Sequence, residues 1–134
     1  TIADYKNNGY DIIYILQVFP NLITNKWFIG FSIKGTQGAE LYEKLNVVSD
    51  LCFEKNLPDA YSSKQFKEYM KKQNYSEVVL CGLDECGCVQ ATAKGALKNN
   101  TKVSIIQNCT VSRFSDEKIK KTRKALLKSG VKYI

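Results

Sequence analysis

The stretch VVLCGLDECGCVQATAKGAL, residues 78–97, decides the fold. It opens with an apolar run rich in β-branched residues, which is typical of a strand covered on both faces. After a short LDEC turn, the remainder is compatible with a helix, since four of its residues fall on neighbouring turns: Val89, Thr92, Ala93 and Ala96. We therefore predict a strand, a turn and a helix, with Cys88 at the turn that opens the helix.

Similar apolar runs recur along the chain. They begin at Asp11 (DIIYILQVF), Asn46 (NVVSDLCF) and Lys102 (KVSIIQ), and VKYI occupies residues 131–134. The runs are nearly continuous rather than alternating, which favours a parallel sheet with helices on both faces. Strands that alternate with helices predict an α/β fold with right-handed crossovers, in which ligands bind at the carboxyl ends of the strands.

Two of the intervening helices have recognisable ends. Ser62 followed by Gln65 predicts a capping box, and Asn74 is a plausible stop for the helix that follows. Ser115 predicts the start of a second helix, and Gly130 its end.

Length and composition limit the possible classes of protein. The chain has 134 residues, 44% of them apolar and 25% charged, which indicates a single globular domain spanning residues 1–134. No apolar run approaches the roughly 18 residues of a membrane span. The opening TIADYKNNGY lacks the features of a signal peptide, so we expect a cytoplasmic protein with no membrane association.

The formal charge of +7 comes mainly from two lysine-rich stretches, KEYMKKQ and DEKIKKTRKALLKSGVK. Lysines at helical spacing usually form a solvated helix face, and no nucleic-acid-binding signature accompanies them. We expect no nucleic-acid partner.

The sequence contains five cysteines and no histidine. Backbone N–H groups at the start of a helix favour a thiolate and can hold an oxyanion, so Cys88 is a candidate nucleophile. The lack of histidine excludes a Cys-His dyad, a Ser-His-Asp triad and a histidine zinc site within this chain. The proton acceptor must then be lysine, carboxylate or water. Three cysteines are predicted to be reduced core residues: Cys52, Cys81 and Cys109.

Three motifs together resemble the isochorismatase-like cysteine hydrolases, which include nicotinamidases and N-carbamoyl amide hydrolases. CGLDECGCVQATAKGAL resembles the family's cysteine segment at Gly82, Cys88, Val89, Thr92 and Ala93. IKGTQGAEL is similar to its GT-x-GAE loop, residues 35–40, and FEKNLPDAYSS to its lysine loop, with Lys55 and Asn56 at the motif positions. The order and approximate spacing of the motifs agree over residues 9–112.

The resemblance implies a three-layer α/β/α, Rossmann-like fold with a mainly parallel sheet, and a C–N hydrolase that acts on a small-molecule amide through a cysteine thioester. It implies catalytic roles for Cys88 and Lys55, and an oxyanion hole made by the backbone N–H groups of Asp84 and Cys88. It also implies a non-proline cis peptide between Leu83 and Asp84 and a homo-oligomer, either a dimer or a tetramer. No cofactor is expected.

The sequence departs from the family pattern at three places. The family's catalytic aspartate lies in an Asp-x-Gln motif on its first strand, and no such motif occurs here. TIADYKNNG reads as the tail of a helix ending at Gly9, so we expect an amino-terminal truncation or a missing strand supplied by another chain. Glu85 replaces a frequent threonine, which makes it a candidate substrate-binding residue. The metal-binding histidines of nicotinamidases are absent, so we expect a metal-independent enzyme.

Other assignments stay open at this stage. Trp27, Phe28 and Phe19 could line a substrate pocket, an oligomer contact or a core. Cys86 and Cys88 form Cys-Gly-Cys, which would suit a thiol redox protein, or half of a metal site that has no obvious other half. The missing aspartate favours a third alternative, a family member that binds a partner without catalysis.

Overall fold

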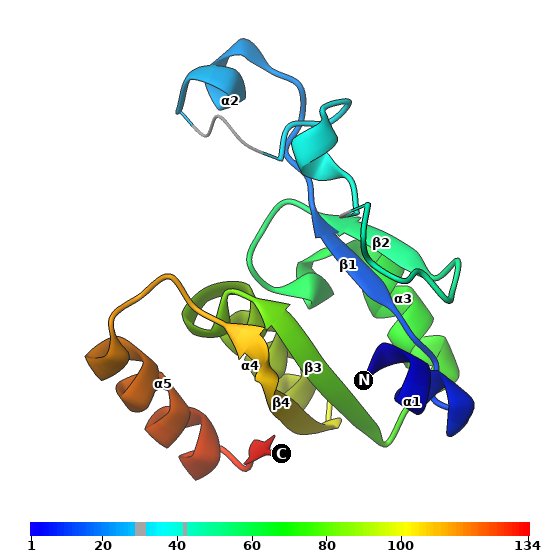
Figure 1. Cartoon of the computed structure of the whole chain (residues 1–134), viewed down its shortest axis with the longest axis vertical. Coiled ribbons are helices and arrows are strands. Elements are labelled where there is room, and N and C mark those ends of the chain that lie inside the picture. Colours follow the sequence, from blue (N-terminus) through cyan, green and yellow to red (C-terminus); the bar gives the residue numbers. More distant parts are fainter. Residues whose placement is uncertain (29–31, 42) are drawn as a thin grey trace. The chain divides into compact units, whose positions relative to one another are not determined.

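The computed structural model describes residues 1–28, 32–41 and 43–134. It contains the predicted alternation of helices with parallel strands (Figure 1). Its contacts divide the chain into two compact units, Thr1–Asn56 and Leu57–Ile134. No helix in the described part of the chain combines the length and apolarity that crossing a membrane requires.

The first unit is built around a pair of parallel strands. Its elements in chain order are α1 (Ile2–Asn7), β1 (Tyr14–Gln17), α2 (Ile23–Phe28), the 3₁₀ turn η1 (Gln37–Ala39) and β2 (Cys52–Lys55). Strands β1 and β2 pair in register from Tyr14 opposite Cys52 to Gln17 opposite Lys55. Helix α1 is followed by Gly9 at φ 82°, which confirms the helix end predicted there.

The second strand is shorter than the apolar run that predicted it. Residues 46–51 are not a strand, and β2 begins only at Cys52. The Ser49 hydroxyl accepts a hydrogen bond from the Leu51 N–H at 3.2 Å, and the Tyr14 hydroxyl accepts one from the Val48 N–H at 3.1 Å. These bonds to side chains take up donors that a longer ladder would need, so the prediction of a strand from Asn46 is wrong at its start.

The second unit is a three-stranded parallel sheet with its helices. After the 3₁₀ turn η2 (Ala60–Ser62), its elements are α3 (Lys64–Gln73), β3 (Glu77–Leu83), the π-helical turn η3 (Glu85–Val89), α4 (Gln90–Lys98), β4 (Lys102–Val111), α5 (Asp116–Lys128) and β5 (Lys132–Tyr133). The strand order is β3-β4-β5 (Figure 1). Four fully buried side chains form the centre of its core: Ala93, Ala96, Ile105 and Leu126.

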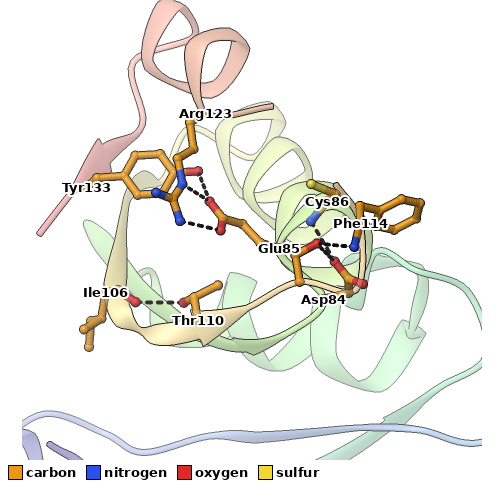
Figure 2. Close-up of polar contacts among 9 residues, drawn as sticks. Asp84, Glu85, Cys86, Ile106, Thr110, Phe114, Arg123 and Tyr133 are labelled. Carbon is orange, nitrogen blue, oxygen red and sulfur yellow. Dashed lines mark hydrogen bonds and ion pairs between the residues drawn. The ribbon is translucent and has the colours of Figure 1, made fainter. Parts of the chain in front are cut away.

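Strand β4 contains a bulge opposite β3. The ladder pairs Leu80 with Ile105 and then Gly82 with Thr110, so β3 advances two residues where β4 advances five. The Thr110 hydroxyl closes the bulge by donating to the Ile106 carbonyl at 2.8 Å (Figure 2). Beyond the bulge, β4 runs alongside β3 to Val111, which brings the following residues beside the end of β3.

The helix ends in this unit follow local capping. Ser115 caps α5 by accepting from the Lys118 N–H, and Asn74 ends α3 in the left-handed conformation, as predicted. The capping box at Ser62 is wrong. The Ser62 hydroxyl donates to the Asp59 carbonyl at 2.6 Å as part of η2, and the N-cap of α3 is Ser63.

Candidate active site

The cysteine segment forms a compact turn between β3 and α4. The peptide bond between Leu83 and Asp84 is cis, which confirms the expectation drawn from the family resemblance. The Asp84 carbonyl then accepts hydrogen bonds from the N–H groups of Gly87 and Val89, both at 3.0 Å. Cys88 is half-buried and lies in η3, the turn that leads directly into α4. The predicted position of the cysteine at the opening of a helix is therefore confirmed.

The Asp84 side chain is itself part of this turn. It is 4% exposed, and its carboxylate accepts from the Cys86 N–H at 3.0 Å and from the Ser112 hydroxyl at 2.5 Å. The Arg113 backbone N–H donates to the second oxygen at 3.1 Å, and the Arg113 Nε lies 3.4 Å from it. Burial opposes ionisation, but these hydrogen bonds outweigh it and lower the pKa of Asp84.

Glu85 points away from the Asp84 contacts into a separate polar cluster (Figure 2). Its side chain is 1% exposed and pairs with the Arg123 guanidinium through two hydrogen bonds of 2.7 and 2.8 Å. The Tyr133 hydroxyl donates a third at 3.0 Å. The Arg123 hydrogen bonds lower the pKa of Glu85 against the effect of burial, and burial together with Glu85 raises the pKa of Tyr133. The cluster ties η3 to α5 and β5.

The second half of the lysine loop contacts α4 within the same unit. The Thr92 hydroxyl, at a motif position of the cysteine segment, accepts from the Ala60 N–H at 3.0 Å. Asp59 accepts from the Tyr61 N–H and lies so close to Gly95 that a side chain there would meet its carboxylate. Two motifs that are separate in the sequence are thus in direct contact.

Lys55 lies in the first unit, at the carboxyl end of β2. Its side chain is buried, 7% exposed, and its Nζ donates to the Gln17 Oε1 at 2.6 Å. The Gln17 amide nitrogen in turn donates to the Lys55 carbonyl at 3.3 Å. Gln17 and Lys55 are paired residues in the parallel β1–β2 ladder, so the register of the two strands places Gln17 beside the lysine.

The aromatic candidates also lie in the first unit. Trp27 is 84% exposed on α2, and Phe19 is half-buried, with its backbone bridged to Ile33. The side chain of Phe28 lies outside the described residues. A role in substrate binding for Trp27, Phe19 and Glu85 stays a prediction.

Three other cysteines were expected in the core, and that prediction is wrong. Cys52 and Cys81 are exposed and Cys109 is half-buried. Residues alternate between the two faces of a strand, and Cys81 shares its face of β3 with Leu83, which is also exposed. Partial burial raises the pKa of both Cys52 and Cys81, with Glu54 adding to the effect at Cys52.

The residues present do not suit a catalytic metal. The sequence has no histidine, and the described ranges contain no cluster of three or more cysteine, aspartate or glutamate side chains arranged to hold an ion. Zinc in particular prefers nitrogen and sulfur ligands in a tetrahedral set.

The comparisons with known proteins agree with this fold. The isochorismatase domain model matches residues 1–131, so the chain belongs to the isochorismatase family, a family of hydrolases. The predicted family and its α/β fold are therefore confirmed. No curated protein matches the chain.

Several solved structures share the fold. The chain is similar to a pyrazinamidase of Pyrococcus horikoshii in complex with zinc, with a TM-score of 0.87 and 19% identity over 99% of this chain and 79% of that one. A nicotinamidase from Bacillus subtilis has a TM-score of 0.82 and 20% identity, over 97% of this chain and 77% of that one. An N-carbamoylsarcosine amidase from Thermoplasma acidophilum has a TM-score of 0.80 and 20% identity, over 98% of this chain and 76% of that one.

Proposed function

We propose that the chain hydrolyses a C–N amide bond of a small molecule, with Cys88 as the nucleophile and a thioester as the intermediate. The observation that carries the proposal is the position of Cys88 in the turn that connects β3 to α4, in a chain of a hydrolase family. In α/β folds this end of the strands is where ligands bind. The amidases among the similar structures support the choice of a C–N bond.

The proposed reaction has two halves. The Cys88 sulfur attacks the amide carbonyl carbon, a C–S bond forms, and the carbonyl electron pair moves onto oxygen. When this intermediate collapses, the C–N bond breaks and the amine leaves with a proton. Water then attacks the thioester, releasing a carboxylic acid and restoring the thiol.

The oxyanion would be held by the backbone N–H groups of Asp84 and Cys88. Donors of this kind are effective because they are oriented before the reaction begins.

We assign Lys55 the proton transfers, with Gln17 as the residue that orients its ammonium group. Burial of the lysine and its short hydrogen bond to Gln17 support an ordered side chain rather than a solvated surface charge. Glu85, Trp27 and Phe19 remain proposed substrate-binding residues. We further propose that the enzyme is cytoplasmic, needs neither metal nor cofactor, and forms a dimer or tetramer.

The test is hydrolysis of small amides, measured as ammonia release. Nicotinamide, pyrazinamide and N-carbamoyl amino acids are the first substrates to use. We expect activity that Cys88→Ala abolishes and that the matched variant Cys109→Ala retains. Iodoacetamide at neutral pH should alkylate Cys88 faster than Cys109 by about ten-fold or more, since only a thiolate reacts.

Other outcomes would separate the alternatives. Equal alkylation of Cys88 and Cys109, with no hydrolysis, would favour a partner-binding protein without catalysis. A reversible loss of two mass units confined to Cys86 and Cys88 under mild oxidant, again without hydrolysis, would favour a thiol redox protein.

A further inference from the structure

We propose that Ser112 is a positioning residue for the nucleophile turn and that it acts through the carboxylate of Asp84. This inference rests on the proposed function, because the contact between Ser112 and Asp84 is proposed to orient Cys88 and the Asp84 N–H for catalysis. The contacts among Asp84, Cys86, Ser112 and Arg113 are called the Asp84 clamp below.

The clamp joins two segments that are distant in sequence. One carboxylate oxygen of Asp84 accepts from the Cys86 N–H at 3.0 Å and from the Ser112 hydroxyl at 2.5 Å. The other oxygen accepts from the Arg113 N–H at 3.1 Å. The nucleophile turn is thereby fastened to the chain that leaves β4.

Ser112 holds this junction from both sides. Its hydroxyl donates to Asp84 and also accepts from the Phe114 N–H at 3.3 Å, so it bridges the carboxylate and the loop before α5. Arg113 contributes mainly through its backbone, since its side chain is 71% exposed. A hydrogen bond to a carboxylate is stronger than one between neutral groups, and the Ser112 bond is short.

The orientation that the clamp fixes is the one that the proposed chemistry needs. The Asp84 carbonyl accepts hydrogen bonds from the N–H groups of Gly87 and Val89, which flank Cys88. The Asp84 carboxylate accepts one from the N–H of Cys86. One residue therefore holds three amides of the turn. If its side chain is released, the turn loses these hydrogen bonds to the residues that follow β4, and we expect both proposed oxyanion donors to change direction.

The experiment compares Ser112→Ala with Ser112→Thr, which keeps the hydroxyl, and with Ser129→Ala as a matched control. Ser129 donates to the Ala125 carbonyl at the end of α5, away from the turn. Two quantities are measured: amide hydrogen exchange of residues 84–88, and the rate of Cys88 alkylation by iodoacetamide. We expect Ser112→Ala to raise exchange in residues 84–88 by about ten-fold. It should also change the rate of Cys88 alkylation by about five-fold. In Ser112→Thr and Ser129→Ala, both measured quantities should stay within about two-fold of their values in the parent chain.

Two results would overturn the inference. One is unchanged exchange in Ser112→Ala. The other is an equal effect of Ser112→Ala and Ser112→Thr on the Cys88 rate, which would indicate packing rather than the hydroxyl. If Cys88 in the parent chain reacts no faster than Cys109, the proposed function fails, while the exchange comparison still decides whether the clamp orders the turn.

Discussion

The buried pair between Glu85 and Arg123 permits a quantitative test, through the substitution Arg123→Met. Glu85 is 1% exposed, and two of its three hydrogen bonds come from Arg123. Methionine retains much of the apolar stem of arginine but leaves the carboxylate with Tyr133 alone. The variant therefore strands a buried charge while changing little of the packing.

The expected loss follows from the contacts. Breaking a buried ion pair by removing one partner lowers the free energy of unfolding by about 3–5 kcal/mol. The Arg123 side chain is 30% exposed, so water can enter the vacated space and the lower limit applies, about 3 kcal/mol. Tyr133→Phe removes a single hydrogen bond to the carboxylate and should lower the same quantity by about 1.5 kcal/mol.

The sign of the pH dependence is fixed by the shift at Glu85. Its pKa is lowered in the folded chain, so its contribution to stability is complete above the unfolded pKa of about 4.3 and is lost as pH falls through the lower folded value. Without Arg123, burial raises the pKa of Glu85, and the carboxyl is protonated near pH 4. The destabilisation by Arg123→Met should therefore be smaller at pH 4 than at pH 7.

Urea unfolding followed by circular dichroism at 222 nm measures the free energy of unfolding at pH 4 and at pH 7. Lys124→Met is the control, since Lys124 is the next residue of α5 and is exposed. A loss below about 1 kcal/mol for Arg123→Met at pH 7, or an equal loss at the two pH values, would refute the account of a stranded buried charge.

Further predictions concern the second unit. Gly95→Ala should lower the free energy of unfolding by about 1–3 kcal/mol, because its new Cβ would lie 2.8 Å from the Asp59 Cγ. The same change normally stabilises a helix. Adding Asp59→Ala should partly restore the melting temperature. Leu126→Ala should lower the free energy of unfolding by about 2–5 kcal/mol, against less than about 1 for the exposed Leu127→Ala. Asn74→Gly should retain the melting temperature, and Asn74→Val should lower it, because φ is 52° at this position.

Much of the fold could be predicted from the sequence because its strands are apolar and its helix ends carry local signals. The strand that opens the stretch 78–97, the helix start at Ser115 and the turn at Cys88 are all found where the pattern indicated. The start of β2 was missed because it depends on a hydroxyl of Tyr14, which is 34 residues away from its partner Val48. Local pattern contains no information about such a contact.

The site was less predictable than the fold. Gln17 is an amide inside the apolar run from Asp11, a signal that was available, but its partner Lys55 follows only from the register of two strands. Ser112 and Arg113 carry no motif at all, and their contact with Asp84 depends on where β4 ends. Cys81 was misplaced because its exposure is set by which face of β3 meets the helices.

The bulge in β4 has a consequence for how this chain can vary. The bulge holds residues of β4 that have no pairing partner in β3, so removing one residue between Ile106 and Cys109 would change the path by which β4 returns to its pairing with β3 at Thr110. Ser112 would then be carried away from Asp84, although neither residue had been altered. An insertion or deletion in this short stretch should therefore disturb the nucleophile turn from a distance, through the position of Ser112.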